Sequence, residues 1–552
     1  MLKQRGRVLT AAVVAVSGAV IATSNSEAAF SRTVMLRGEQ AADLPVGVTY
    51  RGSAASITIN QSGQVAFVDS LIGPGVDSNN DIAMFSEGSG TLKLVAREGS
   101  DAPGANPGDA FWTLNGHISD TGDVAIRSRL KGAGIHDVND WGMWSGNAGT
   151  LSKVIREGDQ APELSGGTLI DGIFFNDGLP LLNNAGHTAF FATLTGTGVS
   201  SANDRGVWTD ANGSLSLVAR KGDGAPGTPT GVNFSHFSGL VMNDADQVAF
   251  RGTLSGAGVN SDNQLGLWIG DSNSLTKIIR TGEAAPGTVP GTKFDSLGSF
   301  AINDTGQSSF FGRLGLGGVI NTANDTGIWT NSNGSLSSVV LEGEVATGAG
   351  PDAFFKTFSA INLGNTGHTT FFATLDGAGI DSTNDQSIWI ENAGTLTMLA
   401  HEGDAAPGHD PGIVFGNFSS VISNKAGQVV FTAFMDGPGI TGTNSLSIWT
   451  ADTNGQLSQL LQTGDLFDVD DDLLAEELRT VSSFQYMTNS YTGRGHGTAF
   501  NDVGELAVRI NFDDGSTGVF VLDTNAIPEP ASLALLSISG LALLSRRRSP
   551  SA

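Results

Sequence analysis

The 552-residue chain contains no cysteine, which excludes disulfide bonds, thiolate catalysis and cysteine-ligated zinc. Packing and strand pairing must therefore hold the fold together. Basic residues are also scarce, since 29 lysines and arginines oppose 55 aspartates and glutamates and leave a formal net charge of −26. A chain this acidic repels phosphate backbones, so we expect no nucleic-acid partner.

Common catalytic signatures are missing as well. The sequence contains no Gly-x-Ser-x-Gly, His-Glu-x-x-His or phosphate-loop motif, and its eight histidines are scattered. A glycosidase needs two carboxylates across a cleft, but the acidic residues are spread along the whole chain and indicate no particular pair. We therefore predict no catalytic residue, and the sequence favours a protein that is not an enzyme while leaving that question open.

Residues 1–29 are predicted to form a secretory signal peptide. An apolar stretch over residues 8–22 follows a positively charged region, and the small residues Ser26 and Ala28 mark the expected cleavage region of a signal peptidase. The apolar stretch is short for a membrane span of about 20 residues, and an uncleaved anchor is the alternative. The positive charges come from Lys3, Arg5 and Arg7.

The C-terminal segment 527–552 carries a second address. Residues 531–545 are an apolar run that lies between a short motif, Pro528, Glu529 and Pro530, and a basic cluster, Arg546, Arg547 and Arg548. This order resembles the PEP-CTERM sorting signal of Gram-negative bacteria. The resemblance implies cleavage near the motif by an exosortase, in cells that make extracellular polysaccharide. The alternative is an ordinary C-terminal anchor. In either case we expect membrane contact only through the terminal segments.

Between the two ends, one pattern recurs eight times over residues 31–523. It begins as Asn60, Gly63, Ala66 and Phe67 and returns about every sixty residues, with a longer last step. Glycine in such a turn allows positive φ, and asparagine caps its own turn through its side-chain amide. The glycine position falls at 63, 122, 186, 246, 306, 367, 427 and 504, where Asp246 is the exception.

Each repeat adds three further marks. A Gly-x-Gly turn with an Asn-Asp pair comes first, then a short strand that contains an aromatic residue, then a strand that ends in a turn with an acidic residue and Ala-Pro. Alternating polar and apolar residues between turn signals predict β-strands, and a stretch such as residues 235–242 supplies a fourth. The aromatic residues are Phe85, Trp144, Trp208, Trp268, Trp329, Trp389, Trp449 and Phe520.

Eight four-stranded units predict an all-β, eight-bladed β-propeller, with an open β-solenoid as the alternative. The ends of the array favour closure. Residues 33–39 match the last strand of the other units, whereas the eighth unit stops after the strand 518–522 and lacks a last strand. We expect the N-terminal strand to complete the C-terminal blade, because a closed ring covers both exposed sheet edges.

The repeated Asn-x-x-Gly-x-x-Ala-Phe signature resembles the NxxGxxAF tandem-repeat proteins, which carry varied C-terminal anchors including PEP-CTERM. The resemblance covers residues from about 31 to 523. Some units depart from it, since Ser119 and Gly364 replace the asparagine. It implies architecture and a surface location but no activity.

Two candidate sites follow from the loops. Asp77, Asn79 and Asp81 place oxygen atoms at alternate positions, as calcium requires, but Ile82 and Gly88 stand where an EF-hand loop has glycine and glutamate. A hairpin loop with side-chain turn bonds is therefore the alternative. The repeated turns from Arg156 to Asp159 and from Arg280 to Glu283 allow either a grip on a sugar or carboxylate or a braced turn.

The last unit differs from the others by an acidic insertion at residues 466–492. Because symmetry does not require residues that occur in one unit only, we predict a ligand-binding site on this insertion or just after it. A solvated, variable loop is the alternative. The candidate residues are Asp470, Asp472, Arg494 and His496.

The sequence thus predicts an exported protein of the cell surface or extracellular matrix in a Gram-negative bacterium. Its rigid acidic propeller is expected to bind or to scaffold, in the context of extracellular polysaccharide. The alternatives are a polysaccharide hydrolase or lyase with a site near the last blade, and a calcium-stabilised adhesin. No cofactor is predicted apart from that calcium.

Overall fold

The computed structural model of the protein describes residues 30–174, 179–470, 477–487 and 498–525. These residues all belong to one compact unit, residues 28–527, whereas a second unit of residues 1–27 and 528–552 lies outside the described residues. The signal and sorting segments, including Ser26, Ala28, the Pro528–Pro530 motif and Arg546–Arg548, therefore lie outside them too. Within the described residues, no helix is long and apolar enough to cross a membrane.

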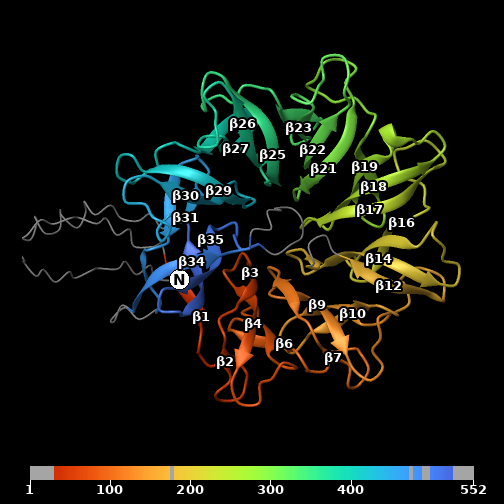
Figure 1. Ribbon diagram of the computed structural model, residues 1–552. Coiled ribbons are helices and arrows are strands. Elements are labelled where there is room, and N and C mark those ends of the chain that lie inside the picture. Colours follow the sequence, from red (N-terminus) through yellow and green to blue (C-terminus); the bar gives the residue numbers. More distant parts are fainter. Residues whose placement is uncertain (1–29, 175–178, 471–476, 488–497, 526–552) are drawn as a thin grey trace, which may run out of the picture. The chain divides into compact units, whose positions relative to one another are not determined.

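Eight antiparallel sheets surround a central axis, as Figure 1 shows, and confirm the predicted eight-bladed propeller. We number the blades in chain order. Blade 1 contains β2 (Thr49–Tyr50), β3 (Ala55–Ile59), β4 (Val65–Ile72), β5 (Ile82–Ser86) and β6 (Lys93–Arg97), and blade 2 contains β7 (Ala110–Phe111), β8 (Asn115–Ile118), β9 (Val124–Lys131), β10 (Trp141–Gly146) and β11 (Ser152–Arg156). Blade 3 contains β12 (Thr168–Phe174), β13 (Leu181–Leu182), β14 (Thr188–Gly196), β15 (Arg205–Thr209) and β16 (Ser216–Arg220). Blade 4 contains β17 (Val232–Met242), β18 (Val248–Gly256), β19 (Leu265–Gly270) and β20 (Leu275–Arg280).

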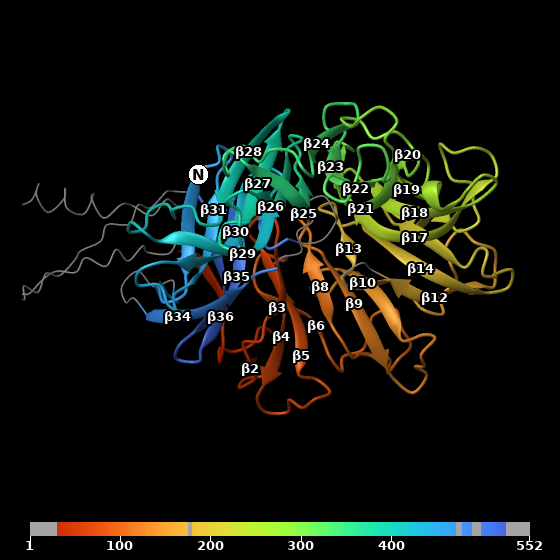
Figure 2. The same cartoon turned by 45° about the horizontal axis from the view of Figure 1, so that its top comes forward.

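The other four blades repeat this plan (Figure 2). Blade 5 contains β21 (Phe294–Ile302), β22 (Ser308–Leu314), β23 (Thr326–Thr330) and β24 (Ser337–Leu341), and blade 6 contains β25 (Ala353–Leu363), β26 (Thr369–Gly377), β27 (Gln386–Asn392) and β28 (Thr395–His401). Blade 7 contains β29 (Val414–Ser423), β30 (Val429–Asp436), β31 (Leu446–Ala451) and β32 (Leu457–Gln462). Blade 8 contains β33 (Leu466–Asp468), β34 (Leu478–Gln485), β35 (Glu505–Phe512), β36 (Thr517–Asp523) and β1 (Phe30–Leu36). A short 3₁₀ turn, Ser261–Asn263, is the one helical element among the described residues.

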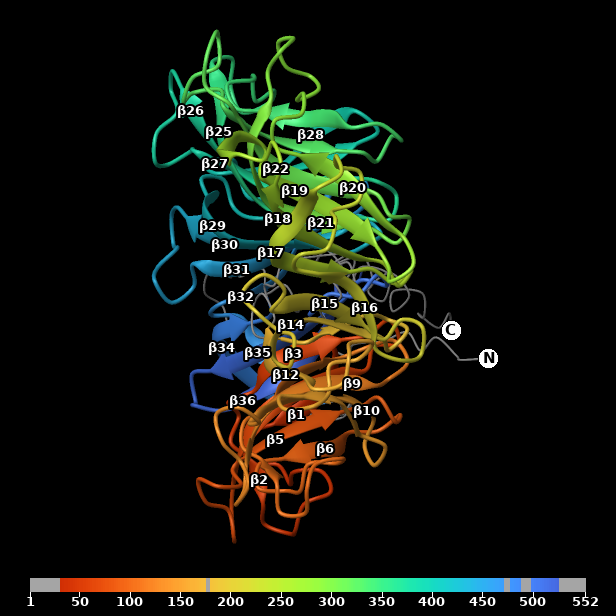
Figure 3. The ribbon, with the colours of Figure 1, turned by 90° about the vertical axis from the view of Figure 1, so that its right-hand side faces the viewer.

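The first strand of each blade lies nearest the axis. First strands of neighbouring blades contact one another, as β17 does with β21, β21 with β25 and β25 with β29. The last strands lie at the opposite edge of each sheet, and Figure 3 shows the ring from its side. The turn between the first and second strands of every blade therefore lies close to the axis, and this turn carries the Asn-x-x-Gly motif or its altered form in blades 2, 4 and 6.

The ring is closed by the N-terminal strand, as predicted. Strand β1 pairs antiparallel with β36, with Thr33 opposite Phe520 and Leu36 opposite Gly518. The strand also reaches blade 1, because the guanidinium of Arg32 donates two hydrogen bonds, of 2.8 and 2.6 Å, to the two carboxylate oxygens of Glu87. Such a two-pronged pair fixes orientation as well as contact.

The core lies between the blades and contains the repeated aromatic residues. Trp268 is completely buried, its ring meets Phe234 edge-on at 4.9 Å between centroids, and its indole nitrogen donates to the carbonyl of Pro226 at 3.0 Å. Edge-to-face aromatic pairs of this kind add to the burial of their area. The same indole-to-proline bond recurs at Trp144, Trp208 and Trp329.

Blade 8 requires one correction to the sequence analysis. The segment 466–492 is not wholly an insertion, because it contains β34, the first strand of this blade, which pairs with β35. The pairing then stops and resumes with Phe500 opposite Leu506. The first strand of this blade is therefore paired with β35 in two separate stretches, one in β34 and one at Phe500.

Candidate functional site

The motif asparagine caps its own turn, as its sequence pattern predicts. In blade 5 the side-chain oxygen of Asn303 accepts hydrogen bonds from the backbone nitrogens of Thr305 and Gln307, at 3.1 and 3.0 Å. Gly306 between them has a φ of 76°. Asp246, which replaces the glycine in blade 4, takes the same left-handed conformation with a φ of 64°.

The same asparagine has a second role that the sequence analysis missed. Its amide nitrogen Nδ2 donates to the backbone carbonyl of Gly364 in the next blade at 3.0 Å and to Oε1 of Gln307 at 2.6 Å. Asn303 is almost fully buried, and these bonds satisfy its amide. Equivalent blade-to-blade bonds join Asn60 to Ser119, Asn183 to Asn243, Asn243 to Asn303, Asn424 to Asn501 and Asn501 to Asn60.

Blade 6 lacks this asparagine and uses a histidine instead. A Cβ atom at Gly364 would overlap the imidazole of His368, so the ring occupies the volume that an asparagine side chain would need. Burial lowers the pKa of His368 to about 4. His368 is therefore neutral at pH 7, and its ring lies beside Gly427 of blade 7 and within 2.7 Å of the hydroxyl of Thr366 through Nδ1.

The residues that follow the motif asparagine form a polar ring around the axis, which we call the axial ring. Most of them bond to the equivalent residue of the next blade; for example, the backbone nitrogen of Asp244 donates to Oδ1 of Asp304 at 2.9 Å, and that of Asp304 to Oδ1 of Asn365 at 3.1 Å. The axial ring consists of Gln61, Asp120, Asn184, Asp244, Asp304, Asn365, Lys425 and Asp502.

Lys425 crosses the axial ring from blade 7 to blades 4 and 5. Its ammonium group donates to Oδ2 of Asp304 at 3.0 Å and also to Oδ2 of Asp244. Burial alone lowers the pKa of Lys425, but the two carboxylates outweigh burial and raise it. Burial likewise raises the pKa of Asp304, and Lys425 outweighs that effect and lowers it. A lysine held protonated in this way is neither a base nor a nucleophile, so its chemistry here is to tie opposite sides of the ring.

Each of the first four blades has an arginine at the turn that follows its last strand, and this arginine braces the turn. In blade 2 the side chain of Arg156 donates through Nε to the carbonyl of Asn139 at 2.7 Å and through a terminal nitrogen to Asp109 at 3.1 Å. The acid of the same turn, Asp159, accepts from the backbone nitrogen of Arg156 at 2.9 Å. The corresponding contacts of Arg280, with Asn263 and with Glu283, follow the same plan. These contacts match the braced-turn interpretation.

The predicted calcium loop is held by hydrogen bonds between its own residues. Oδ1 of Asp77 accepts from the nitrogen of Asn79 at 2.8 Å, and Asn80 accepts from the nitrogen of Asp77 at 3.0 Å. The carboxylate of Asp81 faces Glu98, whose pKa is raised mainly by burial. Among the described residues, no three acidic or histidine side chains gather as a metal-binding group. Calcium binding stays a prediction.

The site predicted on blade 8 is only partly described. Asp472, Arg494 and His496 lie outside the described residues. Asp470 is half-buried beside β33, and its backbone nitrogen donates to Oδ1 of Asp468 at 3.4 Å. The structure thus tests neither the grouping of these residues nor their role.

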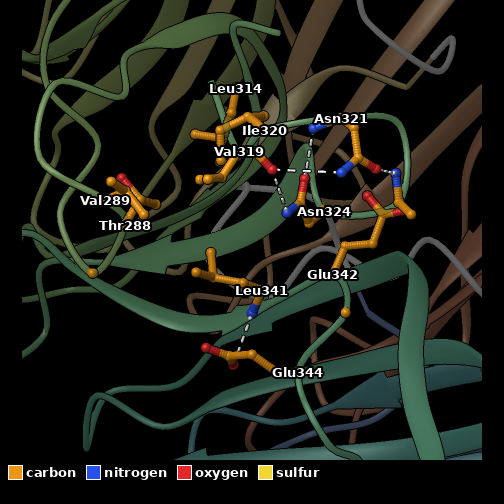
Figure 4. A pocket seen from close by; sticks show the side chains of 13 residues that line it. Thr288, Val289, Leu314, Val319, Ile320, Asn321, Asn324, Leu341, Glu342 and Glu344 are labelled. Carbon is orange, nitrogen blue, oxygen red and sulfur yellow. Dashed lines mark hydrogen bonds between the residues drawn. The ribbon is translucent and has the colours of Figure 1, made fainter. Parts of the chain in front are cut away.

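A pocket of about 440 Å³ lies at the rim of blade 5 (Figure 4). Its walls include Val319, Ile320 and Leu341, and two acids, Glu342 and Glu344, stand at its edge. Both acids are engaged, because Glu342 accepts from the hydroxyl of Thr326 at 2.8 Å and Glu344 from the backbone of Leu341 at 3.1 Å. No sequence pattern indicates this pocket, because its walls come from three separate segments of the chain.

These features define the class of protein: a closed β-propeller whose repeated polar motif joins neighbouring blades. The chain belongs to the Family of unknown function (DUF7453), which matches residues 1–171 and 170–534. A search of curated proteins finds no match.

Several solved structures resemble the chain at low identity. An oligogalacturonate lyase in complex with manganese is 10% identical, with 78% of this chain and 99% of that chain covered and a TM-score of 0.33. The β-propeller domain of the Trilobed protease from Pyrococcus furiosus is 9% identical, with coverage of 75% and 99% and a TM-score of 0.34. A Trypanosoma rangeli sialidase in complex with sialic acid is 10% identical, with coverage of 89% and 87% and a TM-score of 0.24.

Proposed function

We propose that this chain is an exported protein of the cell surface or extracellular matrix, whose rigid acidic propeller binds extracellular polysaccharide. The observation that carries the proposal is the way in which the ring is held closed. Strand β1 completes blade 8, and buried asparagines join neighbouring blades near the axis at six of the eight junctions. A scaffold fixed in this way holds its loops in place without disulfides, as presentation of a binding surface requires.

The terminal segments support the location. The basic and apolar N-terminus is that of an exported protein, and the Pro528–Pro530 motif with its apolar run and arginines is that of a protein handed to an exosortase. Signal peptidase and an exosortase-type enzyme are therefore the proposed processing partners. The net charge of −26 suits a protein that stays dispersed outside the cell.

Two measurements test this proposal. Expression in a Gram-negative host that makes an exosortase, followed by fractionation and intact-mass analysis, is expected to place the chain outside the inner membrane with both ends processed. Deletion of residues 527–552 should change its final fraction without preventing export. A cytoplasmic, full-length product would contradict the location. Purified protein that sediments with the host's extracellular polysaccharide supports the binding role, and turnover of that polysaccharide would overturn it.

A further inference from the structure

Two of the eight tryptophans do not belong to the repeated core position, and both lie in blade 2. Trp112 lies between β7 and β8 and is 44% exposed, and Trp141 is the partly exposed first residue of β10. The six repeated tryptophans are in contrast at most 1% exposed. Single exposed aromatic residues are common, but exposed apolar side chains that gather in one place often mark a binding site, so the two tryptophans of blade 2 are informative as a pair.

Two arginines of β9 hold the tryptophans in place. Trp141 lies opposite Arg129 in the sheet, and the backbone nitrogen of Trp112 donates to the carbonyl of Arg129 at 2.8 Å. The guanidinium of Arg129 is 5.1 Å from the ring centre of Trp112 and 5.8 Å from that of Trp141, and Arg127 lies 3.8 Å over Trp141. We call Trp112, Arg127, Arg129 and Trp141 the blade 2 cluster.

The arginine between the two indoles is itself fixed. Nε of Arg129 donates to Oδ2 of the buried Asp140 at 2.7 Å, and its terminal nitrogen forms an ion pair with the same oxygen. Burial raises the pKa of the neighbouring Glu157 to about 7, so that its charge near Arg127 is reduced at neutral pH. A second carboxylate, that of Asp137, lies 4.0 Å from a terminal nitrogen of Arg129. Asp137 and Asp140 thus balance the two arginines, and the blade 2 cluster is preorganised and close to neutral.

Blade geometry does not require aromatic residues here. The first residue of the third strand, which is Trp141 in blade 2, differs in every other blade and is not aromatic in any of them. These residues are Ile82, Arg205, Leu265, Thr326, Gln386, Leu446 and Thr517. The blade 2 cluster is therefore a local addition to the repeat, and not a part of it.

The neighbouring blade continues the surface. Arg205 in blade 3 holds the position that Trp141 holds in blade 2, so its side chain lies on the same side of the ring. Its guanidinium is 5.8 Å from the ring of Phe174, which is 47% exposed, and one of its nitrogens lies 2.6 Å from Nε2 of His236 in blade 4. Aromatic rings and donor groups thus extend from blade 2 towards blade 4.

We propose that the blade 2 cluster is a carbohydrate-binding site for a neutral hexose polymer, which deepens the proposed function and rests on it. The C–H bonds on one face of a pyranose ring are attracted to the electron-rich face of an indole, and Trp112 offers such a face to solvent. Arginine nitrogens beside it donate to hydroxyl groups. A neutral polymer is favoured over a uronic acid polymer because the chain carries a net charge of −26.

Binding of an array of neutral hexose oligomers to the full chain tests the proposal, with hexagalacturonate as the acidic counterpart. The matched control is Phe434→Ala on blade 7, because Phe434 is 43% exposed and occupies the position of Arg129. We expect Trp112→Ala to weaken binding of a neutral oligomer about tenfold, the scale that stacking on an aromatic side chain supplies. Phe434→Ala should leave binding unchanged, and both variants should melt at the temperature of the parent.

The outcomes separate this site from the broader function. If the parent protein and Trp112→Ala bind neutral oligomers with equal affinity, the proposed site is wrong but polysaccharide binding is still supported. Binding of hexagalacturonate alone overturns the choice of a neutral polymer. If the protein binds neither the oligomer array nor the host's extracellular polysaccharide, this result contradicts both the proposed function and the site. If an oligomer quenches or enhances the tryptophan fluorescence of the parent protein but not that of Trp112→Ala, this result supports contact at Trp112.

Discussion

The imidazole of His368 fills the space that Gly364 leaves open in blade 6. In blades 1, 4, 5 and 7, asparagine and glutamine occupy these two positions, as Asn303 and Gln307 do in blade 5. Gly364→Asn alone should therefore lower the melting temperature, because the new side chain collides with the ring. Gly364→Asn combined with His368→Gln should restore it by rebuilding the blade 5 arrangement. Equal melting temperatures for the single and double variants would contradict this account.

The same histidine predicts a pH dependence of stability. Its folded pKa, about 4, lies below the ordinary value of 6.5, so the fold favours the neutral ring. The contribution of the neutral ring to the free energy of unfolding is complete above pH 6.5 and is lost as the pH falls towards 4. The total loss is about 3 kcal/mol, because each unit of difference in pKa corresponds to 1.36 kcal/mol. Urea unfolding of the parent and of the Gly364→Asn/His368→Gln variant should therefore diverge between these limits, with the parent losing more. Parallel curves would refute the assignment to His368.

The blade-to-blade asparagine bond predicts a large cost for its removal. Asn303→Ala removes one of two hydrogen bonds to the carbonyl of Gly364, which still accepts from the nitrogen of Gly367, and leaves the turn nitrogens of Thr305 and Gln307 without their partner. A lost hydrogen bond costs about 0.5–1.5 kcal/mol and an unsatisfied buried group about 1–3 kcal/mol, so we expect a loss of about 2 kcal/mol in the free energy of unfolding. Asn333→Ala, at an exposed loop position of the same blade, is the control and should change it by less than about 0.5 kcal/mol.

Lys425 predicts a destabilisation that depends on pH. Lys425→Met leaves the carboxylates of Asp244 and Asp304 near each other without a cation, and breaking a buried pair costs about 3 kcal/mol. In that variant burial raises the pKa of Asp304, so the penalty should shrink as the pH falls from 7 to 4. Lys93→Met removes an exposed pair with Asp43 and should have little effect at either pH. A penalty for Lys425→Met that does not change with pH would exclude the carboxylates as its cause.

Much of the architecture follows from the sequence because each repeat carries its own turn and strand signals. The aromatic residue of each third strand and the missing last strand of the eighth unit are visible as periodic features, and the structure places them as predicted. The first strand of blade 8 is not visible in this way, because residues that break its pairing separate β34 from the motif at Asn501. A strand cut in two loses the alternation that identifies it.

The contacts around the axis are harder to predict. The amide of Asn60 donates to a backbone carbonyl about sixty residues away, and a carbonyl leaves no trace in the sequence. The bond of Lys425 to Asp244 joins blades that are not neighbours, so the repeat period does not indicate it. The blade 2 cluster did leave a signal, since Trp112 and Trp141 break the one-tryptophan-per-repeat pattern, but sequence alone does not show that Arg129 lies between them.

Closure of the ring by β1 is the central claim, and the absence of native cysteine allows a direct test by an engineered disulfide. The backbone nitrogen of Arg37 donates to the carbonyl of Thr517 at 2.8 Å, and facing residues of an antiparallel pair lie within disulfide range. Arg37→Cys with Thr517→Cys should form an intramolecular disulfide, identified as a linked peptide by mass spectrometry. The control pair Arg37→Cys with Ser335→Cys, which places the second thiol in blade 5, should not. Two free thiols in the first variant, or equal linkage in both, would contradict a propeller closed by its N-terminal strand.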